Sequence, residues 1–174
     1  MGQVVLYLLD ANTLIDAKRD YFQIERVPEF WAWIVHQGEQ GRIKIPIEIY
    51  EEFEEARRPD GTRDELADWA ADANIKKALL LGDEADPILV AQVIVQGYAN
   101  DLSDTEVETI GRDPFLISRA LADTKLRTIV TTETSRPSRK RANRQIPDVC
   151  KDFGIRCINT FQLLNELDFR TSWK

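Results

Sequence analysis

The sequence predicts an α/β fold with three layers, α/β/α, around a central, mainly parallel and twisted sheet. Short β-prone runs alternate along the chain with longer amphipathic stretches, which is typical of a parallel sheet covered by helices on both faces. The predicted strands are residues 4–9, 42–45, 127–131 and 155–158. The chain has 174 residues and shows no repeat, low-complexity tract or long linker, so we expect one domain over 1–174.

Helix signals occupy most of the remaining sequence. Asn12 or Thr13 is expected to cap the first helix, and Asp113 a later one, because short polar side chains accept from free backbone N–H groups there. Gly38 and Gly41 are expected to end the second helix. The predicted helices are 11–18, 28–37, 46–57, 63–73, 86–98, 113–122, 146–153 and 160–167, with an ambiguous stretch between 73 and 86, a turn at 58–61 and a short helical piece after the polar break 101–105.

Composition excludes several classes of protein. Hydrophobic content of 43% and charged content of 30% are ordinary, and no apolar run approaches the roughly 18 residues of a membrane helix. The N-terminal run lacks a basic segment and a cleavage site, so we expect a cytoplasmic protein without a membrane partner. Cys150 and Cys157 are too few for a zinc site and are expected to be buried free thiols. The single histidine, His36, cannot by itself sustain Ser-His-Asp or Cys-His chemistry.

Four separated stretches each place an acidic residue where this fold would bring it to one rim of the sheet. Asp10 and Glu133 follow predicted strands, and sites in parallel sheets form beyond the carboxyl ends of the strands. Glu52 lies within a predicted amphipathic helix, and Asp113 lies at the start of another. Gathered carboxylates repel one another unless a cation neutralises them, and Mg²⁺ or Mn²⁺ prefers oxygen ligands of this kind. The sequence therefore predicts a site for a hard divalent metal.

Asp10 and Asp113 are the first choices for direct metal ligands, with Glu52 third and Glu133 fourth. Glu48 and Glu51 compete with Glu52 for the second acid. At about 100° per residue Glu48 and Glu52 share a helix face, whereas Glu51 lies to one side. Asn12 and either Thr131 or Thr132 could orient these carboxylates or a metal-bound water.

A basic segment follows the last of these acids. The net charge of the chain is −7, yet residues 136–144 hold five basic side chains and no acid. They are Arg136, Arg139, Lys140, Arg141 and Arg144. Because clustered basic groups attract phosphates, the segment predicts a nucleic-acid contact beside the metal site. The alternative is a solvated surface loop.

The acids stand in motifs that follow one another in a definite order. These are Leu9-Asp10-Ala11-Asn12-Thr13-Leu14, then Pro46 with Ile49, Glu52 and Phe53, then Asp113 with Leu116, Ile117 and Ala120, and last Ile129-Val130-Thr131-Thr132-Glu133. In this order they resemble the PIN-domain superfamily, the nucleases that include VapC-type toxins, over essentially the whole chain. Glu133 stands where the wider family most often has Asp. Residues 145–160 look more similar to a PIN-like branch known only as a domain of unknown function.

The resemblance implies a metal-dependent nuclease, an endoribonuclease of toxin–antitoxin type. It would hydrolyse phosphodiester bonds with Mg²⁺ or Mn²⁺ held by Asp10, Glu52, Asp113 and Glu133. The resemblance also implies an RNA substrate, with DNA as an alternative, an antitoxin protein as a partner, and a homodimer as one oligomeric state.

Other classes have less support in the sequence. It contains no G-x-x-x-x-G-K-[ST], G-x-G-x-x-G or G-x-S-x-G motif, which argues against nucleotide-binding and serine-hydrolase chemistry. One alternative from a different class stays open. It is a non-catalytic PIN-like module that binds RNA or a partner protein.

Overall fold

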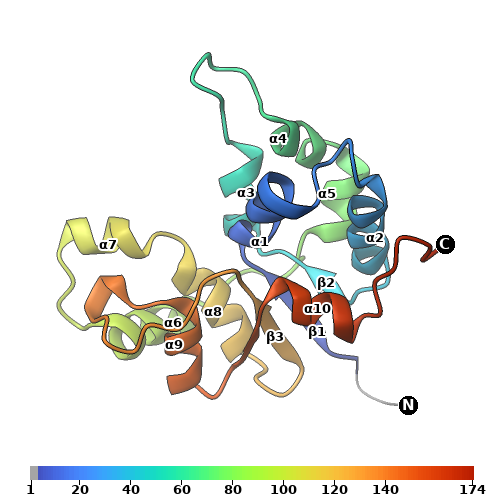
Figure 1. The fold of residues 1–174 in the computed structure, drawn as a ribbon. Coiled ribbons are helices and arrows are strands. Elements are labelled where there is room, and N and C mark those ends of the chain that lie inside the picture. The colour runs from blue at the N-terminus through green and yellow to red at the C-terminus, as the bar shows by residue number, and fades with distance from the viewer. Residues whose placement is uncertain (1–3) are drawn as a thin grey trace.

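A computed structural model describes residues 4–174 of the protein (Figure 1). Over this range the sheet has four strands, all parallel, in the order β2-β1-β3-β4. They are β1 (Leu6–Leu9), β2 (Ile43–Lys44), β3 (Arg127–Val130) and β4 (Arg156–Ile158). Helices flank the sheet on both faces, which confirms the predicted three-layer α/β/α class. Residues 1–3, which the expected domain 1–174 includes, lie outside the described residues.

The helices fall close to most of the predicted ranges. They are α1 (Ala11–Asp16), α2 (Pro28–Glu39), α3 (Ile47–Glu54), α4 (Glu65–Ala70), α5 (Ala73–Leu79), α6 (Pro87–Gln92), α7 (Asp104–Ile110), α8 (Asp113–Leu121), α9 (Ile146–Asp152) and α10 (Thr160–Glu166). Short π-helical segments, Ala17–Tyr21 and Val93–Tyr98, continue α1 and α6, and a 3-10 turn, Arg141–Asn143, precedes α9.

The two central strands are buried on both faces. Leu8 and Leu9 of β1 and Ile129 and Val130 of β3 are fully buried. Near-continuous apolar runs of this kind are typical of parallel strands covered by helices on both sides. α8 packs on β3, α9 on β4 and α2 on β2, so three of the four strands have a helix packed directly on them.

The ambiguous stretch between residues 73 and 86 contains a helix. α5 begins after Asp72, whose carboxylate accepts from the backbone N–H groups of Asn74 and Ile75. The residue after the helix, Leu80, then pairs with Ile45 in a parallel bridge beside β2. The helix is too short for its periodicity to stand out, and it is defined by its cap and by its packing on α2.

The predicted caps of two helices were wrong. Asp10, not Asn12 or Thr13, occupies the N-cap position of α1, and its side chain makes no capping hydrogen bond. Thr13 instead donates its hydroxyl to the carbonyl of Val130, tying α1 to β3 at 3.0 Å. Asp113 lies inside the first turn of α8, because Arg112 takes the N-cap position.

Gly38 does not end α2, contrary to expectation. The helix continues through it to Glu39, and Gly41, with φ +71°, follows the end of the helix. A Cβ atom at Gly38 would lie 2.8 Å from the Ala78 carbonyl oxygen and 2.7 Å from Leu79 Cδ2. Glycine is therefore required at this position for the close approach of α2 to α5.

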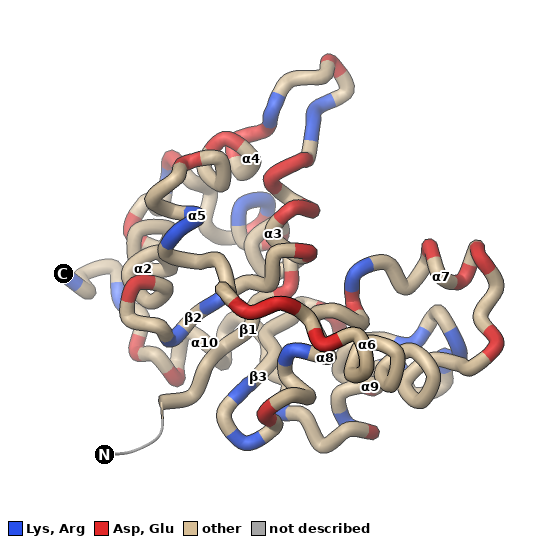
Figure 2. Tube along the Cα trace, turned by 180° about the vertical axis from the view of Figure 1, so that it is seen from behind, with Lys and Arg blue, Asp and Glu red and all other residues tan. Residues whose placement is uncertain are grey.

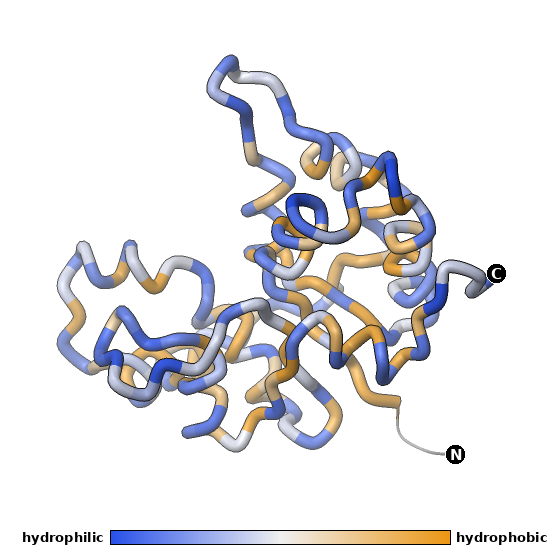
Figure 3. The backbone as a smooth tube through the Cα atoms, in the orientation of Figure 1, coloured by the Kyte–Doolittle hydropathy of each residue, from blue (hydrophilic) through white to orange (hydrophobic). Residues whose placement is uncertain are grey.

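A hairpin projects between α3 and α4 (Figure 1). An antiparallel bridge joins Arg57 to Arg63, and the turn between them lies where residues 58–61 predicted one. Figure 2 shows both signs of charge on this hairpin, and Figure 3 shows that it is largely hydrophilic.

Two expectations drawn from composition have a structural counterpart. Both cysteines are free thiols, as predicted, but only Cys150 is buried, and Cys157 is partly exposed. No helix in residues 4–174 is both long enough and apolar enough to cross a lipid bilayer.

Candidate metal centre

Asp10 and Thr131 lie side by side at the carboxyl end of the sheet. β1 and β3 pair in register up to Leu9 and Val130, and the Asp10 N–H extends this pairing with a 2.9 Å hydrogen bond to the Val130 carbonyl. The Thr131 hydroxyl then donates to a carboxylate oxygen of Asp10 at 2.8 Å. Both residues are buried. Each strand ends on an apolar residue followed by a polar one, so the register itself places the polar pair at the rim.

The pKa of Asp10 reflects its neighbours as well as its burial. Burial and, to a smaller extent, the carboxylates of Glu133 and Glu52 together raise this pKa to about 7, and the Thr131 hydrogen bond opposes the increase. Like charges have this effect only at short range, so the fold brings these acids within electrostatic reach of Asp10.

Asp113 reaches the same rim from the first turn of α8. Its helix packs on β3 and against α3, which carries Glu52. Burial, followed by the carboxylates of Asp10, Glu133 and Glu52, raises the pKa of Asp113 to about 8. The other three acids singled out in the sequence therefore all raise the pKa of Asp113.

α3 offers three glutamates, and the structure separates them. Glu48 pairs with the buried Arg119 at 3.4 Å, and Glu51 pairs with Arg112 at 3.1 Å. Glu52 has no ion-pair partner among residues 4–174. Glu52 is exposed to solvent, yet partial desolvation by its surroundings raises its pKa, and the positive charge of Arg112 partly offsets this. The two rival glutamates already have a counter-charge, which leaves Glu52 as the unpaired acid of this part of the helix.

Glu133 is bound to the backbone as well as facing the other acids. One of its carboxylate oxygens accepts the N–H of Ile146, the first residue of α9, at 2.7 Å. Its own N–H donates to the Thr131 hydroxyl at 3.1 Å. One carboxylate oxygen is thus committed to the start of α9, and the other is left to contact a cation or a water. The additional methylene of Glu relative to Asp provides reach for this double role.

The chemistry of these donors fits a hard cation. Asp10, Asp113, Glu52 and Glu133 offer oxygen atoms only, which Mg²⁺ and Mn²⁺ prefer. Across the described chain, however, no three His, Cys, Asp or Glu side chains stand close enough to hold one ion between them. Mg²⁺ usually keeps several waters and takes one or two carboxylates together with substrate oxygens. Asp10 and Asp113 could therefore bind an ion directly, and Glu52 and Glu133 through water.

Of the residues expected to orient these acids, Thr131 alone contacts one. The Thr132 hydroxyl donates to Asp16 at 2.6 Å and contacts none of the four acids, so Thr131 is the one of the two alternatives that lies against Asp10. Consecutive residues in extended chain point to opposite sides, which turns Thr131 toward Asp10 and Thr132 away. Asn12 is exposed, and its side chain makes no hydrogen bond within residues 4–174.

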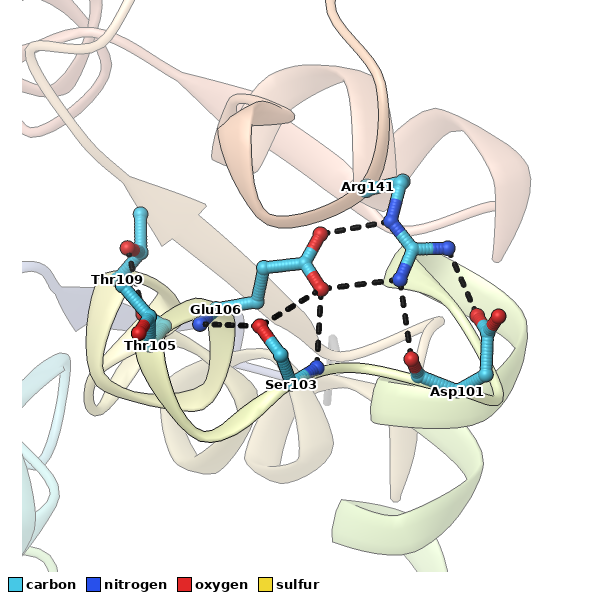
Figure 4. Close-up of polar contacts among 6 residues, drawn as sticks. All are labelled: Asp101, Ser103, Thr105, Glu106, Thr109 and Arg141. Atoms are coloured by element: carbon cyan, nitrogen blue, oxygen red, sulfur yellow. Dashed lines mark hydrogen bonds and ion pairs between the residues drawn. The ribbon is translucent and has the colours of Figure 1, made fainter.

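Arg141 of the basic segment is bound to α7 rather than free for a phosphate (Figure 4). Its guanidinium donates to both carboxylate oxygens of Glu106, at 2.6 and 2.9 Å, and to Asp101 at 2.7 Å. These hydrogen bonds hold the pKa of Glu106 at about 2. Glu106 also completes the capping box of α7 with Ser103. Arg141 therefore fixes the segment to the acidic α7 (Figure 2).

Arg144 is also bound to other residues of the protein. It pairs with Asp152 at 2.7 Å and donates to the carbonyls of Gly97 and Asp148. Of the five basic side chains expected to contact a nucleic acid, Arg141 and Arg144 are therefore paired within the protein, and three remain for such a contact. Three basic side chains of the segment are exposed and have no side-chain partner in the part of the chain that the structure describes: Arg136, Arg139 and Lys140.

Tyr98 is a further residue near the acidic centre that was not identified from the sequence. Its hydroxyl is buried and has no hydrogen-bond partner among residues 4–174. Burial raises the pKa of Tyr98, and the carboxylates of Asp113 and Glu133 raise it further. A phenol beside these carboxylates could donate to a water or to a substrate oxygen. Tyr98 ends an apolar helical stretch, so the sequence pattern itself contains no sign of this position.

Comparison with known proteins identifies the family of the chain. A family model described as Domain of unknown function (DUF4411) matches residues 7–171. No curated protein and no solved structure matches the chain. The family match runs from β1 through the four acids to the end of α10 and beyond it. The protein therefore belongs to the DUF4411 family.

Proposed function

We propose that this protein is a metal-dependent nuclease, an endoribonuclease with a PIN-like centre that hydrolyses phosphodiester bonds with Mg²⁺ or Mn²⁺. The observation that supports it best is the electrostatic coupling of Asp10 and Asp113. These acids come from separate parts of the chain, and each has a pKa raised to about 7 or 8 by burial and by other carboxylates. A fold gains nothing from burying like charges together, but a cation would offset the repulsion.

Each acid would have a separate task in this reaction. A bound divalent ion supplies positive charge that acidifies the attacking water and offsets charge on the phosphoryl oxygens. Asp10, fixed by Thr131, and Asp113 would hold the ion. Glu52 and Glu133 would orient water, and their lack of an arginine ion pair in the described residues supports this role.

Cleavage assays test this function. Purified protein is incubated with single-stranded RNA, structured RNA and DNA in the presence of Mg²⁺, Mn²⁺ or EDTA. We expect metal-dependent cleavage by the native protein, loss of cleavage in Asp10→Asn and Asp113→Asn, and full cleavage by Glu55→Gln. Glu55 is an exposed acid directly after α3, so this variant controls for the loss of a nearby charge.

Two outcomes would argue against the proposal. Cleavage that persists in Asp10→Asn would assign the activity to another site or to a contaminant. RNA binding without cleavage under any metal condition would favour the non-catalytic module instead. The proposed antitoxin partner has a separate test, which is co-purification of the chain with the product of an adjacent small reading frame.

A further inference from the structure

A cavity of about 530 Å³ opens beside the candidate metal centre. Its walls are the end of α1 with the following π-helical segment, the residues after β3, and the junction of β4 with α10. Thr131 and Glu133 belong to both the cavity and the acidic centre. The volume is in the range of pockets that bind small organic groups. A group held in this cavity would therefore lie next to Glu133 and to Thr131, which contacts Asp10.

Two aromatic rings form part of the cavity wall. Tyr21 and Phe161 are 56% and 50% exposed, which is unusual for large hydrophobic side chains of this protein. Their centroids are 5.2 Å apart in an edge-to-face arrangement. Tyr21 follows α1 and Phe161 belongs to α10, so the tertiary fold brings together two rings that the sequence separates widely. Exposed rings at a pocket are suited to stack on another planar ring.

The polar groups of the wall are arranged for a neutral ligand with a hydrogen-bonding edge. Asn159 and Gln162 use their side-chain oxygens to cap α10. Their amide NH₂ groups have no hydrogen-bond partner within residues 4–174. Thr160, between them, is 8% exposed, and its buried hydroxyl is likewise unpartnered in the described chain. Buried polar groups are normally satisfied, so this hydroxyl points to a missing partner.

The charge of the wall disfavours a phosphate. Asp16, Asp20 and Glu133 line the cavity, and Arg19 pairs with the first two of these acids. The third acid has no arginine or lysine partner among the described residues. An anion would be repelled here, whereas N–H donors on an uncharged ring would meet carboxylate acceptors.

We propose that this cavity binds an unpaired nucleobase of the strand whose phosphate lies at Asp10 and Asp113. The base stacks on the face of one of the two rings, Tyr21 or Phe161, and contacts the edge of the other, because the rings lie at 79° to each other. Its polar edge meets Asp16 and the amide groups of Asn159 and Gln162. The inference rests on the proposed nuclease function. It adds the requirement for an unstacked base, and therefore for a single-stranded or looped substrate.

Free nucleosides test the cavity independently of cleavage. Saturation-transfer NMR is recorded for adenosine, guanosine, cytidine and uridine, with ribose as the control that lacks a base. We expect transfer to the base protons of at least one nucleoside and none to ribose. The signal should disappear in Phe161→Leu and Tyr21→Leu, which remove the rings, and persist in Tyr21→Phe. Val107→Ala, at another exposed apolar residue, should leave it unchanged.

A short single-stranded RNA, kept intact with Ca²⁺ in place of Mg²⁺, provides the second measurement. Loss of one stacked base is expected to weaken its affinity by about tenfold in Phe161→Leu. Circular dichroism and the midpoint of thermal unfolding show whether each variant remains folded.

The outcomes separate this inference from the nuclease proposal. Cleavage by the native protein with equal RNA affinity in Phe161→Leu would overturn the nucleobase site alone. Ring-dependent nucleoside binding without any cleavage would overturn the nuclease proposal and leave the site. Absence of nucleoside signals in the native protein would overturn the inference, whichever result the cleavage assay gives.

Discussion

The Thr131 hydroxyl donates a 2.8 Å hydrogen bond to the Asp10 carboxylate and accepts a 3.1 Å hydrogen bond from the Glu133 N–H. One side chain thereby sets the position of two of the four acids. It lowers the pKa of Asp10 against the effect of burial. The ionised form, which a cation needs, is stabilised by a neighbour that carries no charge of its own.

Thr131→Val tests this relationship, because valine keeps the shape and removes the hydroxyl. Leaving a buried carboxyl group and a backbone N–H unsatisfied is expected to cost about 1–3 kcal/mol of stability. The pKa of Asp10 should rise further, so Mg²⁺ affinity should fall. Urea unfolding measures the first effect and metal titration the second.

Thr13→Val is the matched control. Its hydroxyl is also at the end of β3 but donates to the Val130 carbonyl and to no acid. It should reduce stability without changing metal affinity. Equal metal affinities in the two variants would contradict the role assigned to Thr131.

Metal binding itself should raise the thermal stability of the native protein. A ligand that binds only the folded state contributes about 2.7 kcal/mol at a hundredfold excess over its dissociation constant. Differential scanning fluorimetry with Mg²⁺ or Mn²⁺ should show a gain that Asp10→Asn and Asp113→Asn abolish and Glu55→Gln retains. An equal gain in all four proteins would place the ion elsewhere.

The stability of the metal-free protein should depend on pH through the same two carboxyl groups. Their folded-state pKa values, about 7 and about 8, lie above the ordinary value of 3.8. Between these values the folded state binds more protons than the unfolded state, so this contribution is complete below about pH 4 and is lost as the pH rises through 7 and 8. Urea unfolding in EDTA from pH 5 to pH 9 should show a decline that Asp10→Asn/Asp113→Asn flattens.

Glu106 and Glu166 should make the stability of the folded protein fall, rather than rise, as the pH is lowered into the acid range. Hydrogen bonds from Arg141 and Arg156, respectively, lower the pKa of each glutamate to about 2. Their contribution is present above the ordinary value of 4.5 and is lost as the pH falls toward 2. The metal-free protein should therefore be most stable at about pH 4, between the ordinary values of 3.8 and 4.5, where the two opposing slopes cancel. A maximum above pH 7 would contradict the carboxyl assignments.

RNA affinity should depend on salt through the exposed part of the basic segment. Each phosphate contact on a single strand contributes a slope of roughly 0.7 in the logarithm of affinity against the logarithm of salt. Arg139→Ala/Lys140→Ala should flatten the slope by about 1.4, whereas Lys151→Ala, an exposed base on α9, should not. Arg141→Ala should instead lower stability, because it breaks the pairs with Glu106 and Asp101. An unchanged slope in the double variant would reduce the segment to a surface loop.

The contact between α2 and α5 provides a prediction about the fold. Helix propensity alone favours alanine over Gly38 by about 1 kcal/mol. The added Cβ would meet backbone and side-chain atoms of α5 below 3.0 Å, and such overpacking costs about 1–3 kcal/mol. Gly38→Ala should therefore destabilise the protein, and Gly82→Ala, which meets nothing within 4 Å, should change its stability by less than about 0.5 kcal/mol. A more stable Gly38→Ala would show that α5 can move away.

The strands and the acids at their ends were predictable because both depend on neighbours in the sequence. A buried parallel strand is a short apolar run, and the first polar residue after it falls at the rim of the sheet. Asp10 after Leu9 and Thr131 after Val130 follow this rule. The fold class and the position of these two residues were therefore determined by the sequence alone.

The tertiary structure decided which of several similar residues acts at the rim. Glu48 and Glu51 are neutralised by Arg119 and Arg112, which lie 61 to 71 residues further along the chain. Likewise, Arg141 pairs with Glu106 and Asp101, 35 and 40 residues away. The sequence shows that a residue is charged but not whether it forms an ion pair in the folded protein. Only the packing of α3 against α8, and of the basic segment against α7, brings the partners close enough for Coulomb attraction to select among them.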